Sequence, residues 1–145
     1  WANAAKLTDA LKAAETPDFD EIRVATGTYH AGADSLKTFV LASETGITLS
    51  GGYAGIDNNE SPDPATYPTI LSGKKNSSAS ADSSPHVLTV INKGSGCTTV
   101  KGFTIQDGKT KDGTGFIVID GDTIINSQGV GVYAYTENNA KIDLE

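Results

Sequence analysis

Several residue types are scarce in this chain of 145 residues, and each scarcity argues against a class of protein. The sequence has one cysteine, Cys97, and a lone cysteine forms neither an internal disulfide nor a metal site. Lys and Arg number 11 against 18 Asp and Glu, for a net charge of −7. We therefore expect no nucleic-acid partner, because phosphate contacts need clustered basic side chains. No apolar run approaches the roughly 18 residues of a membrane span, so we expect no direct membrane insertion of this segment.

Methionine is absent as well, and the sequence begins with Trp1. Because natural reading frames begin with methionine, we expect either a processed product or an excised part of a longer protein, from which any targeting segment has already been removed. Cys97 follows the turn-like Gly94-Ser95-Gly96, and we expect it to be a small packed residue rather than a reactive thiol.

The first segment has the pattern of a short amphipathic helix. Over 3–14, apolar residues that include Leu7 and Leu11 recur on one helical face. Asn3 or Thr8 could supply the N-cap.

From residue 21 onward the pattern changes to short β-branched and apolar runs between Gly, Asn, Asp, Ser and Pro, which is typical of strands and turns. Two segments, 54–68 and 74–84, are expected to be surface loops. The predicted strands are 21–25, 38–41, 47–50, 69–71, 86–91, 99–105, 116–119, 123–125, 130–135 and 141–144.

An apolar triplet followed by a polar corner recurs in the second half, at 100–105, 123–127 and 142–144. The offsets of about 18 to 24 residues match one turn of a β-solenoid, in which each coil stacks on its neighbours. This spacing favours a solenoid over a sandwich, since the Asn-Gly hairpin signal is missing.

Five segments in this order resemble the pectin-lyase-like family of right-handed parallel β-helix proteins, and in particular the N-terminal part of large bacterial surface proteins with polymorphic-outer-membrane-type repeats. The resemblance implies an all-β, right-handed parallel β-helix in one domain over 1–145, with a capping helix at about 3–15 and coils from about 21. It rests on Leu7-Thr8-Asp9-Ala10-Leu11-Lys12-Ala13-Ala14, Asp20-Glu21-Ile22-Arg23-Val24-Ala25-Thr26-Gly27-Thr28-Tyr29, Ile47-Thr48-Leu49-Ser50-Gly51-Gly52-Tyr53-Ala54-Gly55, Pro68-Thr69-Ile70-Leu71-Ser72-Gly73 and Val100-Lys101-Gly102-Phe103-Thr104-Ile105.

The resemblance also implies how the two ends of the coil are treated. Leu7 and Leu11 would cover the first coil, whereas nothing evident covers Ile142 and Leu144. We therefore expect a fragment of a longer chain, or self-association through the uncapped C-terminal coil. Gly102 fits a corner where backbone passes close to backbone, or else an ordinary loop position.

No catalytic constellation is predicted. Hydrolytic members of the family use closely spaced aspartates, and Asp120 and Asp122 are the nearest candidates. An Asp-Gly-Asp corner is more typical of a solvated turn that caps backbone amides. Arg23, beside the cap, is expected to have a structural or surface role.

Two ligand sites are predicted. Ca²⁺ is a candidate because Asp57, Asn59, Glu60 and Asp63 put several oxygen ligands on one loop, although a merely solvated acidic loop is the alternative. No other cofactor is expected.

Tyr133 and Tyr135, two apart in a predicted strand, should project from one face and could contact a polysaccharide or cell-surface glycan. The valine and alanine set or the tyrosine set could point inward.

The leading hypothesis is a non-catalytic, secreted or cell-surface β-helix segment that acts as a scaffold, an adhesin or a glycan-contacting surface. The alternative is the N-terminal portion of a polysaccharide lyase or glycoside hydrolase with its catalytic coils beyond residue 145.

Overall fold

The computed structural model describes residues 5–16, 20–32, 38–57, 60–75, 83–109, 116–119, 122–125 and 131–145, with only the backbone described in 116–119 and 122–125. These residues form one short helix and twelve strands. No helix in the described ranges has the length and apolar character needed to cross a membrane.

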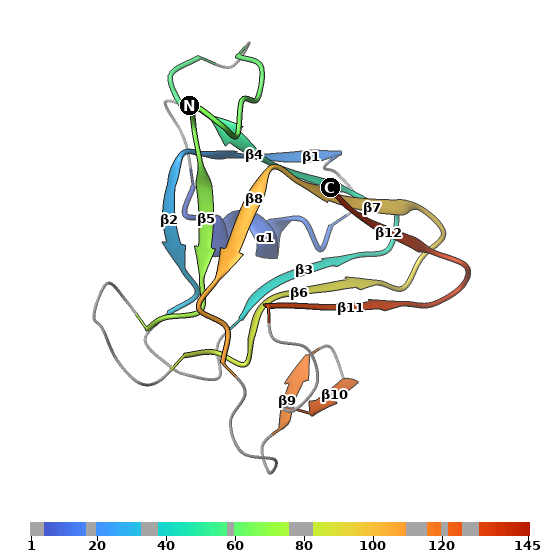
Figure 1. Ribbon diagram of the computed structural model, residues 1–145. Coiled ribbons are helices and arrows are strands. Elements are labelled where there is room, and N and C mark those ends of the chain that lie inside the picture. Colours follow the sequence, from blue (N-terminus) through green and yellow to red (C-terminus); the bar gives the residue numbers. More distant parts are fainter. Residues whose placement is uncertain are drawn as a thin grey trace.

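Ten of the strands form three small parallel sheets, which make three sides of a triangle in Figure 1. Sheet A contains β1 (Glu21–Ala25), β4 (Thr48–Tyr53), β7 (Cys97–Lys101) and β12 (Lys141–Leu144). Sheet B contains β2 (Gly27–His30), β5 (Thr69–Ser72) and β8 (Phe103–Gln106). Sheet C contains β3 (Phe39–Ser43), β6 (His86–Asn92) and β11 (Gly131–Thr136). The other two strands, β9 (Phe116–Ile119) and β10 (Asp122–Ile125), form an antiparallel pair.

The hydrophobic core lies inside the triangle, and residues of all three parallel sheets supply it. In β3 the side chains of Phe39 and Leu41 are buried, and they align in register with Leu88 and Val90 of β6. A strand directs successive side chains to opposite faces, so these residues form inward rows across sheet C. Sheets A and B contribute Leu49, Val100 and Leu71 to the same cluster.

The predicted β-helix solenoid was wrong. The structure is β-rich, but its parallel sheets hold only three or four strands each, and an antiparallel pair lies between β8 and β11. Partners in sheet A run Glu21, Thr48, Thr99 and Asp143, at unequal steps of 27, 51 and 44 residues. The last two steps are about twice the expected offset of about 18 to 24 residues. Long excursions between strands break the regular repeat that a clear solenoid requires.

The helix α1 (Leu7–Ala13) covers one end of the triangle. Its Leu7 and Leu11 are buried in the core cluster, and the helix packs against β3 and β1. Lys6 occupies the N-cap position without a side-chain hydrogen bond, so Thr8 is not the cap, and Asn3 lies outside the described residues. At the opposite end, Leu144 of β12 is 53% exposed.

Buried polar side chains and glycines shape the corner between sheets C and A. The amide nitrogen of Asn92 donates to the carbonyl oxygen of Gly96 (3.0 Å) and the hydroxyl of Thr98 (3.0 Å), while its oxygen accepts from the backbone N–H of Gly94 (3.2 Å). A Cβ on Gly94 would overlap the carbonyl oxygen of Glu44 in the neighbouring corner. The stacked corners therefore approach backbone to backbone, as only glycine permits.

Candidate functional site

The outer face of sheet C, which points away from the core, carries two rows of aligned side chains. Phe39 and Leu41 of β3 point inward, so the residues between them point outward, and the parallel register sets their partners. Both predicted tyrosines lie on this face, since Val132 is the residue that packs against the core. One row is Val40, Thr89 and Tyr133, and the other is Ala42, Ile91 and Tyr135.

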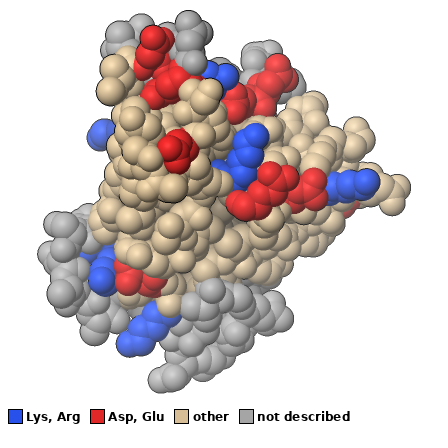
Figure 2. Space-filling model, turned by 45° about the horizontal axis from the view of Figure 1, so that its top comes forward, with Lys and Arg blue, Asp and Glu red and all other residues tan. Residues whose placement is uncertain are grey.

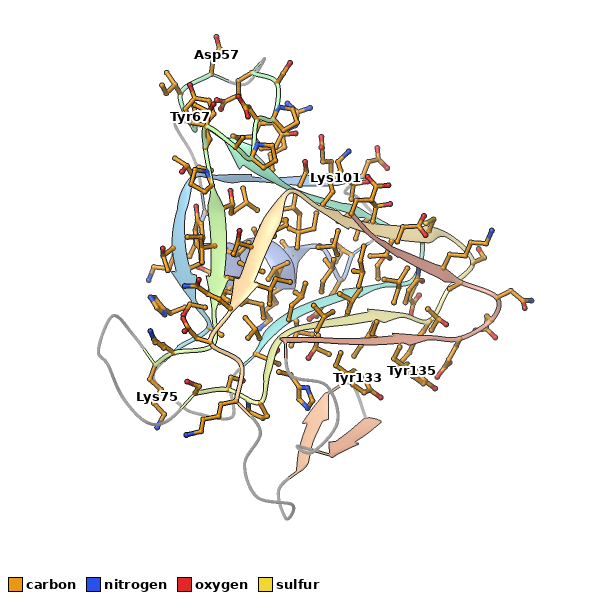
Figure 3. All side chains as sticks on the ribbon, viewed as in Figure 1. Asp57, Tyr67, Lys75, Lys101, Tyr133 and Tyr135 are labelled. Carbon is orange, nitrogen blue, oxygen red and sulfur yellow. The ribbon has the colours of Figure 1, made fainter. Side chains whose placement is uncertain are left out.

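Both tyrosine rings are held in place. The ring of Tyr133 meets that of His86 edge to face, with centroids 5.7 Å apart. The hydroxyl of Tyr135 donates a hydrogen bond to Oε1 of Glu137 (2.9 Å). Figure 3 shows both side chains pointing outward from β11, beside one another. Because each ring is already oriented and half-buried, contact with a ligand would cost little side-chain entropy.

A groove of about 270 Å³ runs beside the second row. Its apolar floor includes Val40, Ala42 and Ile91, and its rim carries Glu15, Glu44 and Lys93 together with Ser43. A second groove of about 330 Å³, between α1 and β3, shares Val40 and Glu15 with the first. The two grooves therefore form an elongated, shallow surface with an apolar floor and charged edges.

This combination of groups suits a ligand that has an apolar face and a polar rim. Tyrosine rings offer flat apolar area with a hydroxyl at the edge, and carboxylates accept hydrogen bonds from hydroxyl groups. Residues two apart in a strand are about 6.6 Å apart, which suits successive units of a chain-like ligand. The hydrophobic groove residues were missed by the sequence analysis, although the alternation in 39–43 was the signal that could have found them.

The structure describes three of the four predicted calcium ligands, Asp57, Glu60 and Asp63. Asn59 lies outside the described residues. The Glu60 carboxylate accepts a hydrogen bond from the backbone N–H of Gly55 (2.9 Å). Asp63 Oδ1 accepts one from the backbone N–H of Thr66 (3.2 Å), and the hydrogen bonds from Thr66 lower the pKa of Asp63. No group of three or more His, Cys, Asp or Glu among the described residues is placed to hold a metal ion. Calcium binding at Asp57 and its neighbours therefore stays a prediction.

The remaining residues considered in the sequence analysis are the two aspartates Asp120 and Asp122, Arg23 and Cys97. Asp120 lies outside the described residues, and so does the side chain of Asp122. Arg23 is exposed and pairs with Glu21 (Nε to Oε2, 2.8 Å). Cys97 was expected to be packed, but it is exposed, because it is the first residue of β7 and occupies an outward-facing position. Its thiol donates to Asp143 (3.3 Å), which raises the pKa of the thiol and disfavours the thiolate.

Charged side chains of both signs occupy the outer face of sheet A. Arg23 pairs with Glu21 and also lies over the ring of Tyr53, 5.6 Å from its centroid. Lys101 and Asp143 lie on the same face, where Thr99 aligns with Asp143. Figure 2 shows acidic and basic side chains interleaved on this side of the molecule. A mixed surface of this kind offers no single-sign field to attract a charged polymer.

A small polar cluster ends sheet B. The Ser72 hydroxyl donates to Oδ2 of Asp107 (2.8 Å), and Lys74 Nζ lies 3.4 Å from Oδ1. His30, aligned with Ser72, has Nδ1 3.0 Å from the carbonyl oxygen of Lys74. Ser72 donates its hydrogen bond to Asp107 and not to His30. Ser72, His30 and Asp107 therefore do not form a relay for nucleophilic catalysis.

Acid should weaken the fold through Asp107. Its pKa is lowered, first by the hydrogen bond from Ser72 and further by Lys74. A carboxyl group with a lower pKa in the folded chain stabilises the fold above its unfolded pKa, and this contribution is lost as the pH falls through the folded pKa. Urea unfolding at neutral pH and below about pH 4 measures this contribution. Between the two conditions, we expect the free energy of unfolding to fall less in Asp107→Asn than in the parent chain. Equal losses in both chains would contradict this role.

The fold and the site define a β-rich protein of small parallel sheets with an aromatic outer face on one of them. Comparison with protein-family models, with curated proteins and with solved structures found no match. The family resemblance drawn from the sequence therefore stays a prediction.

Proposed function

We propose that this chain is a non-catalytic carbohydrate-contact segment of a secreted or cell-surface protein, and that the outer face of sheet C makes the contact. The observation that carries the proposal is the pair Tyr133 and Tyr135, both oriented on one face of sheet C, on which a groove of mixed apolar and charged lining lies over β3 and β6.

The chemistry of a sugar ring matches this surface. A pyranose has faces of C–H groups, which pack on tyrosine rings, and a rim of hydroxyls, which hydrogen-bond to carboxylates. Glu15 and Glu44 border the groove, and Glu137 already orients Tyr135. A shallow surface excludes little water, so we expect millimolar to micromolar affinity, equivalent to roughly 4 to 8 kcal/mol.

The alternative hypothesis, that this chain is the N-terminal portion of a polysaccharide lyase or glycoside hydrolase, stays a prediction. Its catalytic residues are expected beyond residue 145, and no described cluster favours it over carbohydrate contact. Binding to a polysaccharide is common to both hypotheses, so the experiment below tests the contact surface itself.

A glycan array that holds neutral and acidic oligosaccharides tests the proposal. We expect the parent chain to bind a subset of linear glycans and the double variant Tyr133→Ala/Tyr135→Ala to lose at least about tenfold in affinity, or 1.4 kcal/mol. Tyr135→Phe keeps the ring and should retain most of the binding. Tyr67→Ala is the matched control, because Tyr67 lies in the loop at the far side of the molecule from Tyr133 and Tyr135 (Figure 3).

Both tyrosines are only half-buried, so we expect the variants to fold. Thermal melting of each variant checks this. No binding by the parent chain, or a double variant that is folded and binds as the parent does, would overturn the proposal.

A further inference from the structure

Three lysines gather at the corner where the strands of sheet B end. These strands run parallel, so the segments that follow β5 and β8 leave the sheet at the same edge. Lys74 and Lys75 follow β5, and Lys109 follows β8. Figure 3 labels Lys75 at this corner, and at the lower left of Figure 2 basic side chains lie around an acidic one. We call Lys74, Lys75 and Lys109 the basic corner.

Backbone hydrogen bonds hold the basic corner together. Ser84 donates its N–H to the carbonyl oxygen of Gly73 (2.8 Å), and its own carbonyl oxygen accepts the N–H of Lys109 (3.0 Å). Lys74 forms an antiparallel bridge with Ser83. Lys74 and Lys109, both exposed, therefore flank one fixed segment of backbone. Their long side chains can reach the same group of a ligand.

Positive charge is in excess at the basic corner, although the net charge of the chain is −7. Within the described part of the chain, the carboxylate that contacts the corner is that of Asp107, whose Oδ1 lies 3.4 Å from Lys74 Nζ. On sheet A, in contrast, Arg23 is matched by Glu21. A local positive field on an acidic molecule selects where an anionic ligand approaches.

We propose that the basic corner binds the sulfate or phosphate ester groups of a polysaccharide. A lysine ammonium is a point charge with three donors, and a tetrahedral ester group presents three acceptor oxygens. Several ammonium groups can therefore share one ester group from different directions. Planar carboxylates are better matched by the fork of an arginine, whereas the basic corner is built of lysine.

The small size of the basic corner favours a sparsely charged polymer. Nucleic acid carries a phosphate about every 3.4 Å along each strand, so a bound strand brings more phosphates than three lysines neutralise. The surplus phosphates would face an acidic molecule and be repelled. A polysaccharide with occasional ester groups can place one of them at the corner while its neighbouring units stay uncharged.

The basic corner borders the proposed carbohydrate face. Two residues after Ser84, the ring of His86 meets that of Tyr133, with centroids 5.7 Å apart. One linear ligand can therefore contact the tyrosines and the lysines. The inference rests on the proposed function for the nature of the polymer, but different residues carry it, so the two can fail separately.

Fluorescence anisotropy with a labelled sulfated hexasaccharide and with its desulfated counterpart tests the inference. At low salt, we expect the parent chain to bind the sulfated probe at least about tenfold more tightly, since several charged contacts act together. Lys74→Gln, Lys75→Gln and Lys109→Gln should each weaken this binding by about two- to fivefold, as the loss of an exposed ion pair does. The triple variant should bind the two probes alike, and the salt dependence of binding should be lost with the lysines.

Lys101→Gln is the matched control, because it removes the same charge from sheet A, at the other end of the molecule from Lys75 (Figure 3). It should bind the sulfated probe as the parent does. Asp107→Asn removes the carboxylate that competes for Lys74 and should strengthen binding by about two- to threefold. Thermal melting shows whether each variant is folded.

Equal affinity of the parent chain for the two probes, or binding of neither, would contradict the inference. So would a folded triple variant that keeps the sulfate preference, or weaker binding by folded Asp107→Asn. Tighter binding of a single-stranded DNA of the same charge would assign the basic corner to nucleic acid instead, and inorganic sulfate that competes as strongly as the hexasaccharide would assign it to a free anion.

The tyrosine variant separates this inference from the proposed function. Loss of the sulfate preference in the triple lysine variant, with no loss of affinity in Tyr133→Ala/Tyr135→Ala, would keep the basic corner and overturn carbohydrate contact at the outer face of sheet C. Loss of affinity in the tyrosine variant alone would have the opposite meaning.

Discussion

Leu88→Ala is expected to lower the free energy of unfolding by about 2–5 kcal/mol, as truncations of buried leucines do. Leu88 is fully buried in the middle strand of sheet C, between Phe39 of β3 and Val132 of β11. Truncation there removes contacts on both sides and leaves a cavity, because neighbouring strands cannot move together without breaking their ladders. Urea unfolding followed by circular dichroism measures the change.

Leu144→Ala is the matched control for this prediction. Leu144 is 53% exposed on β12, so the same chemical change should cost under about 1 kcal/mol. Equal losses at the two positions would mean that Leu144 is covered in the isolated chain, contrary to its exposure.

Gly94→Ala should destabilise the chain by about 3 kcal/mol, the upper part of the range for overpacking. An alanine Cβ at Gly94 would overlap the Glu44 carbonyl oxygen, and backbone cannot move aside as a flexible side chain can. The loss would arise from the stacked corners between sheets C and A, which Asn92 also braces.

Ser95→Ala gives the comparison at the next residue. Ser95 is exposed in the same corner, so its truncation should change stability by under about 0.5 kcal/mol. A Gly94→Ala variant as stable as Ser95→Ala would show that the corners are looser than the close approach implies.

Local features of the fold followed from the sequence because short-range physics decides them. Leu7 and Leu11 on one helical face predicted α1, and both are buried. The segment 99–105 was predicted as one strand, but Gly102 has a φ of 74° and divides it into β7 and β8. Strand β2 was not among the predicted strands, although its Tyr29 packs against the core.

The architecture did not follow, because long-range pairing decides it. The apparent repeat of about 18 to 24 residues predicted neighbours that the structure does not pair. Thr48 pairs with Thr99 across a long excursion, and within the part of the chain that the structure describes β9 has β10 as its one partner strand. Apolar triplets recur in any β-rich chain, so their spacing did not determine which strands are adjacent.

The candidate site was accessible to the sequence in part. Period-two spacing put Tyr133 and Tyr135 on one face but left open which face is inward. Packing of Val132 against the core directs the tyrosines outward. The groove beside them comes from residues of β3 and β6, far away in sequence, so only the sheet order brings it there.

The most direct test of carbohydrate contact is a two-dimensional NMR titration of the labelled chain with an oligosaccharide that binds on the array. The proposal predicts that shifts of backbone amides concentrate on the outer face of sheet C, around Val40, Ile91, Tyr133 and Tyr135. Shifts concentrated on the outer face of sheet A, around Arg23 and its neighbours, with none at the two tyrosines, would contradict it.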